Sequence, residues 1–102
     1  MRNKTNTTKP RATKTVRLET SRMGNPLPAV EIHLPGLENQ RLLWAELHEL
    51  AAKVERATPD FEGWCVNIDR TGDESGAVSL ELLDCTPEEV SRAMDLLKRV
   101  AG

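Results

Sequence analysis

Alternation of apolar and polar residues is the clearest pattern in the chain. It predicts β-strands, because successive side chains of a strand point to opposite faces. The clearest case runs from Ala29 to Leu34, where Val30, Ile32 and Leu34 share one face. A shorter alternation around Val16 predicts an earlier strand. That strand covers residues 15–20, and two further strands are predicted in this way at residues 61–69 and 77–83.

Apolar residues three or four positions apart predict two helices, because that spacing places them on one side of a helix. The first helix is expected from Glu38 to Arg56. Its apolar stripe comprises Leu43, Leu47, Leu50 and Val54. The second is expected to begin after Thr86, a good N-cap, with Pro87 at the first helical position and Glu89 three residues after the cap.

The elements follow in the order β-β-α-β-β-α. We therefore expect an α+β fold in which a single antiparallel sheet of three to four strands carries two helices on one face. This arrangement is ferredoxin-like or a related two-layer sandwich. A hydrophilic connection bounded by glycine, residues 70–76, is expected to form the loop between the last two strands. Val30 aligns with Val78 at a shift of 48 positions, a pattern consistent with an internal repeat.

The net charge of −2 conceals two oppositely charged parts. Residues 1–22 contain seven basic side chains and one acidic side chain, whereas residues 23–102 contain seven basic and fifteen acidic ones. Residues 1–13 also have almost nothing apolar to bury. We expect residues 1–13 to form a disordered basic arm and residues 14–102 to form a single acidic α+β domain.

The basic arm could contact an anionic partner, and nucleic acid is the alternative that its charge favours. The side chains expected to make this contact are Arg2, Lys4, Lys9, Arg11, Lys14 and Arg17. Aromatic residues make up only 3% of the chain, which removes the stacking platform by which some sheets bind single-stranded RNA. The acidic part of the chain suits a basic protein partner instead.

The sheet face opposite the helices is expected to be polar, and it holds most of the side chains that could carry chemistry. The residues expected there are Glu31, His33, Cys65, Asn67, Asp69, Ser79, Glu81 and Leu83. Trp44 and His48 lie four positions apart and share a flank of the first helix. The candidate ligand or interface residues are His33, Trp44, His48, Asn67, Asp69 and Glu81. A solvated or dimer-facing surface is the simpler interpretation of this face.

Several classes of protein are not supported by the sequence. Cys65 and Cys85 are twenty positions apart with no paired cysteine or histidine, so we expect no metal site and no cofactor. The catalytic motifs of nucleotide-binding enzymes, hydrolases and zinc proteases do not occur, so we expect no catalytic residues and no enzyme. No signal-like apolar segment or membrane span is recognisable, so we expect a cytoplasmic protein with no membrane partner.

The function expected from these observations is a non-enzymatic small binding or regulatory module. It would act through protein–protein contacts as a homodimer, in the manner of a bacterial or phage accessory protein, because a sheet with one helical layer has an open face and free edges. One alternative is a nucleic-acid-associated protein that uses residues 1–22. A second alternative is a small-molecule-binding module with a pocket near His33 and His48.

Overall fold

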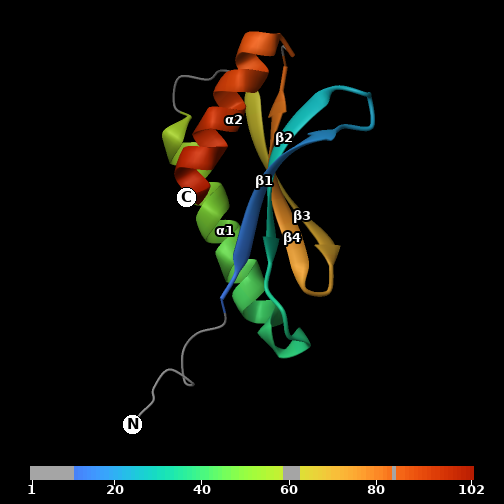
Figure 1. Cartoon of the computed structure of the whole chain (residues 1–102), viewed down its shortest axis with the longest axis vertical. Coiled ribbons are helices and arrows are strands. Elements are labelled where there is room, and N and C mark those ends of the chain that lie inside the picture. The colour runs from blue at the N-terminus through green and yellow to red at the C-terminus, as the bar shows by residue number, and fades with distance from the viewer. Residues whose placement is uncertain (1–10, 59–62, 84) are drawn as a thin grey trace.

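The fold has the β-β-α-β-β-α order that the sequence predicts (Figure 1). A computed structural model of the chain describes residues 11–58, 63–83 and 85–102. None of the helices in these ranges combines the length and apolar character needed to cross a membrane. The elements are β1 Thr13–Thr20, β2 Pro26–His33, a 3-10 turn η2 Leu37–Asn39, α1 Gln40–Ala57, β3 Trp64–Gly72, β4 Ser75–Leu82 and α2 Pro87–Ala101.

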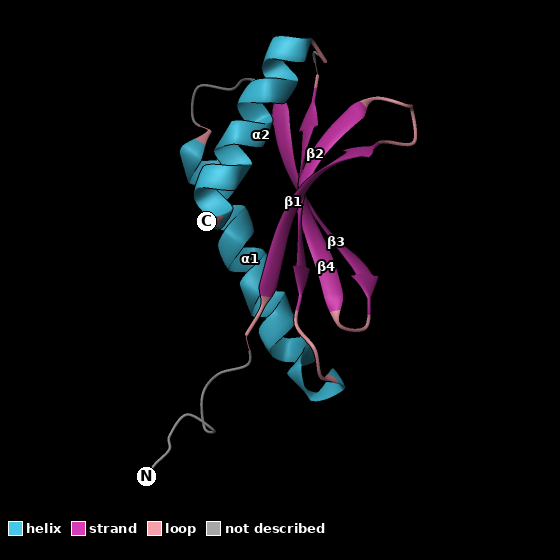
Figure 2. Ribbon diagram, viewed as in Figure 1, coloured by secondary structure: helices cyan, strands magenta, loops and turns pink. Residues whose placement is uncertain are grey.

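The four strands form one antiparallel sheet in the order β1-β2-β4-β3, and the two helices form a second layer on one of its faces (Figure 2). The predicted α+β fold is therefore confirmed. Helix α1, which follows β2, packs mainly against β3 and β4, whereas α2 packs against β2 and β1. Each helix thus covers strands of the other half of the chain, which ties the two halves into one core.

The hydrophobic core lies between the sheet and the helices. The alternating residues of the two central strands and the stripes of both helices meet there, as their periods predict. The largest side chains that are fully buried are Ile32, Leu43, Leu47, Leu80, Leu97, Val30, Val54, Val78 and Pro28. Because helices cover only this face, the opposite face of the sheet is left mainly to polar and small side chains.

The strand order β1-β2-β4-β3 places the two β-β-α halves on either side of the antiparallel β2–β4 pair. Val30 lies directly opposite Val78 where β2 pairs with β4. These are the same two residues that align when the halves of the sequence are superposed. Antiparallel pairing reverses the direction of one strand, so only one pair of aligned residues can also be opposite one another. A two-fold axis relating the halves would therefore pass between Val30 and Val78.

The beginning of α2 confirms the capping pattern in the sequence. The Thr86 hydroxyl accepts a hydrogen bond from the backbone N–H of Glu89 at 3.1 Å, and Pro87 is the first helical residue. Helix α1 has no comparable side-chain cap. The segment that leads into α1 is instead fixed by a residue distant in the sequence: the Gly36 N–H donates a hydrogen bond to Glu74 Oε2 at 2.8 Å.

The predicted loop over residues 70–76 is much shorter than expected. Strand β3 continues to Gly72 and β4 begins at Ser75, so only Asp73 and Glu74 form the turn. Gly76 is a buried strand residue, and a Cβ atom there would lie 2.6 Å from Leu47 Cδ1. A glycine in this strand lets α1 approach the backbone closely, whereas in the sequence it resembles a loop residue.

Candidate functional site on the open sheet face

The odd-numbered residues of the four strands occupy the sheet face that the helices leave uncovered. Strand pairing fixes which of them are neighbours: Arg17 lies opposite Ala29, Ala29 opposite Ser79, and Ser79 opposite Asn67. We call this surface the open face. It comprises Thr13, Thr15, Arg17, Glu19, Leu27, Ala29, Glu31, His33, Cys65, Asn67, Asp69, Thr71, Ser75, Ala77, Ser79 and Glu81. The predicted open-face residues Asn67, Asp69, Ser79 and Glu81 are thus brought together.

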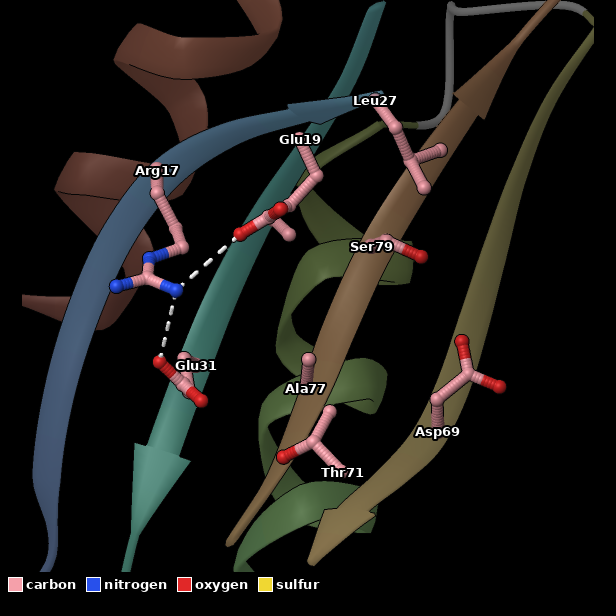
Figure 3. A pocket seen from close by; sticks show the side chains of 9 residues that line it. Arg17, Glu19, Leu27, Glu31, Asp69, Thr71, Ala77 and Ser79 are labelled. Carbon is pink, nitrogen blue, oxygen red and sulfur yellow. Dashed lines mark hydrogen bonds and ion pairs between the residues drawn. The ribbon is translucent and has the colours of Figure 1, made fainter. Parts of the chain in front are cut away.

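The middle of the open face is hollow because its central strands carry short side chains. Ala77 and Ser79 lie at the floor, with Arg17 on β1 and Asp69 on β3 at its sides (Figure 3). Ala29, which pairs with Ser79, also lines this hollow. The resulting central hollow has a volume of about 360 Å³. It is lined by Arg17, Glu19, Leu27, Ala29, Glu31, Asp69, Thr71, Ala77 and Ser79.

The charged groups of the central hollow are arranged unequally around it. Arg17 Nη1 lies 3.2 Å from Glu31 Oε1 and 3.4 Å from Glu19 Oε2, so one guanidinium contacts two carboxylates (Figure 3). The Asp69 carboxylate, on the opposite side, has no ion pair or hydrogen bond with any residue that the structure describes. Three carboxylates against one guanidinium leave the hollow with a formal charge of −2.

Ser79 is the polar group at the floor of the central hollow. The residue is 4% exposed, and within the described part of the chain its hydroxyl makes no hydrogen bond. Its neighbour Asn67 instead donates from Nδ2 to Glu81 Oε1 at 3.1 Å. A buried hydroxyl left unpaired costs about 1–3 kcal/mol. A ligand in the hollow that hydrogen-bonds Ser79 would recover part of that cost.

Trp44 and His48 form a second cluster, on the helical side of the sheet. Their ring centroids are 5.7 Å apart, as their spacing on one helix flank suggests. The Arg70 guanidinium carbon lies 5.4 Å from the centroid of the Trp44 ring, and Arg70 also donates to the backbone oxygens of Gly72 and Asp73. The sequence gives no signal for Arg70, which it places in a loop. Trp44 remains 40% exposed. The contact between Arg70 and Trp44 joins β3 to α1.

The structure does not bring the two histidines together. His33 is an exposed residue at the end of β2, whereas His48 is stacked on Trp44 in the helical layer. His33 belongs to the open face of the sheet and His48 to a helix on the other face, so the pocket near these two residues stays a prediction. Of the cysteines, Cys65 is exposed and Cys85 is partly buried. No group of three or more histidine, cysteine or acidic side chains that could hold a metal is found in the described ranges.

The candidate anion-binding residues are placed only in part. Arg2, Lys4 and Lys9 lie outside the described residues. Arg11 and Lys14 are exposed at the beginning of the described chain. Arg17, by contrast, points onto the open face and is held by carboxylates. An anionic partner would meet those carboxylates beside Arg17, so Arg17 is poorly placed to bind phosphate.

Comparison with known proteins adds no functional information: no family model, curated protein or solved structure matches the chain.

Proposed function

We propose that the protein is a non-enzymatic binding or regulatory module that acts through protein–protein contacts as a homodimer. The observation that carries this proposal is the one-sided packing of the sheet. Both helices cover the same face, and no described residue covers the open face or the outer edges of β1 and β3. Uncovered strand edges present unpaired backbone groups, and they pair readily with another strand.

Strand β1 is the edge best suited to pair with a second copy. It pairs with β2 over its whole length of eight residues, and it contains no proline. Leu18 in this strand is 51% exposed. Strand β3, in contrast, has a register shift between Arg70 and Gly72, and such irregularities protect edge strands from pairing. Pairing through β1 would bury part of Leu18 and extend the sheet across both copies.

The open face is the surface we assign to a further protein partner. Its central hollow carries a formal charge of −2, and residues 23–102 contain eight more acidic than basic side chains. This charge favours a basic segment of a protein and opposes close approach of phosphate groups. The nucleic-acid alternative would depend on the arm alone, because the open face has the wrong charge for it.

Replacing Leu18 with lysine tests the homodimer. Leu18→Lys places an additional cation on the proposed interface of each copy, so the protein should behave as a monomer at micromolar concentration. Leu83→Lys is the matched control, since Leu83 is also an exposed leucine, at 80%, but lies outside β1. Light scattering after size-exclusion chromatography gives the molar mass of each variant.

The control variant should retain the mass of a dimer. If the wild-type protein and both variants all have the mass of one chain, the homodimer is refuted. If both variants lose the dimer equally, the β1 edge is not its interface.

A further inference from the structure

We infer that the central hollow binds the cationic end of a lysine or arginine side chain from a basic segment of a protein partner. This inference rests on the proposed function, because it assigns the partner that the open face would meet. Net charge decides against an anion, since three carboxylates and one guanidinium surround the hollow. Arg17 is occupied by Glu19 and Glu31, which leaves the Asp69 carboxylate unpaired on the other side.

The hydrogen-bonding groups of the central hollow also suit a cation. Ammonium and guanidinium groups only donate hydrogen bonds, so they need several acceptors close together. Asp69 supplies a carboxylate, and the buried Ser79 hydroxyl supplies an acceptor with no described partner. Thr71 Oγ1 lies 3.0 Å from Ser75 Oγ and donates to it, so the Thr71 lone pairs remain available. These groups line one hollow and can contact one cationic head together.

The apolar part of the central hollow suits the stem of a long basic side chain. Ala77 lies at the floor and Leu27 at one end (Figure 3), and Ala29 also lines the hollow. Lysine and arginine bury their methylene groups along such surfaces while the charged head reaches polar groups. A volume of about 360 Å³ is near the lower end of the range for ligand pockets, which suits one side chain.

A protein segment fits this site better than a free amine does. The central hollow lies in the middle of an open sheet face, so a ligand with only a cationic head leaves the surrounding surface unused (Figure 3). A peptide can place one basic side chain in the hollow and rest its backbone on the neighbouring strands. Further carboxylates nearby, such as Glu81, add to the attraction for basic residues on either side.

Titration of the full chain with matched peptides tests this site. The first peptide is short, acetylated and contains a single arginine. The second has citrulline instead, which keeps the shape but removes the charge. Amide resonances of Ala29, Ala77 and Ser79 in nitrogen-15 correlation spectra should move with the arginine peptide. The citrulline peptide should bind at least about tenfold more weakly, since charge-assisted hydrogen bonds are the stronger kind.

Two variants and one control locate the site. Asp69→Asn keeps the size of the side chain and should weaken the arginine peptide about tenfold, because the unpaired carboxylate is lost. Ala77→Leu should fill the central hollow and block binding. Glu55→Gln removes the same amount of charge from the exposed side of α1, so it should leave the affinity within about twofold.

Three results would overturn the inference. One is equal weakening by Asp69→Asn and Glu55→Gln, which would show a general charge effect. Another is movement of resonances only outside the central hollow, or no binding at all. The third is binding of ethylguanidinium without binding of the peptide, which would assign the hollow to a free small cation. None of these three results depends on the molar mass of the protein. A failed peptide titration is therefore distinct from a failure of the proposed homodimer, which the molar mass tests.

Discussion

Gly76 illustrates how much a single residue decides in this fold. A methyl group there would lie 2.6 Å from Leu47 Cδ1 and 3.0 Å from the backbone oxygen of Asp69. Leu47 is fully buried, and backbone atoms in a sheet cannot move freely, so neither neighbour yields without a cost. The close packing of α1 on β4 therefore depends on the absence of a side chain at this position.

We predict that Gly76→Ala destabilises the protein by about 1–3 kcal/mol, the usual cost of overpacking a core. Chemical denaturation followed by circular dichroism measures the change in the free energy of unfolding. Gly72→Ala is the control, because a Cβ there would meet only the Ser75 hydroxyl, at 3.1 Å. Equal destabilisation by the two substitutions would contradict the packing described for Gly76.

At the same scale, the sequence predicts which side of the sheet a residue occupies but not what it touches. Alternation places Ser79 and Asp69 on the open face, as observed. The contact of Arg17 with Glu31 depends on the pairing of β1 with β2, which joins residues fourteen positions apart. Single-residue patterns contain no information about that pairing, so neither this contact nor the central hollow could be predicted.

The helices and strands themselves follow closely from local signals. Capping by Thr86 and the apolar stripes predict both helices, and alternation predicts the strands. The main error of the sequence prediction is the loop assigned to residues 70–76. Glycine and polar residues there have a high propensity for loops. Pairing with β2 and packing under α1 override that propensity and extend both strands.

The proposed pairing of β1 with its counterpart is restricted by charge. In a joined sheet, the helix-covered faces of the two copies must lie on the same side. Side chains alternate between faces, so this requires each residue to lie opposite one an even number of positions away. The two-fold axis must therefore pass through a residue of β1 and not between two residues. An axis at Arg17 would place two guanidinium groups opposite each other, which is unfavourable. An axis at Val16 avoids this contact and pairs seven residues, 13–19, with the same residues of the second copy.

This register predicts a specific disulfide. In a chain carrying Cys65→Ser and Cys85→Ser, the variant Val16→Cys should form a covalent dimer on mild oxidation, because residues on the axis lie about 5 Å apart. Leu18→Cys should not, since its two copies would be about 13 Å apart along the strands. Non-reducing electrophoresis reads the result. Cross-linking through Leu18→Cys but not Val16→Cys would place the axis elsewhere.

On the scale of the whole molecule, the order of the strands is the feature that creates the candidate site. Placing β4 between β2 and β3 brings Ala29, Ala77 and Ser79 side by side with longer side chains around them. The sequence predicts a connection between the last two strands but not the order of the four strands in the sheet. That choice arises from long-range packing of each helix on the other half of the chain, which no local pattern encodes.

Charge is also separated on the scale of the whole chain. The excess of basic residues before position 23 and of acidic residues after it is a property of the sequence. The described structure adds that Arg17 is turned toward carboxylates of the open face. A dimer held by strand pairing and apolar contact should therefore depend little on salt, whereas assembly through the arm or through bound nucleic acid would weaken as salt rises.

The molar mass of the nuclease-treated, full-length protein tests the proposed homodimer most directly. Light scattering at micromolar concentration should give twice the chain mass of 11.4 kDa, at both low and high salt. Backbone pairing along β1 and burial of Leu18 predict this result. A mass of one chain under both conditions, or a dimer that disappears with nuclease or salt, would contradict it.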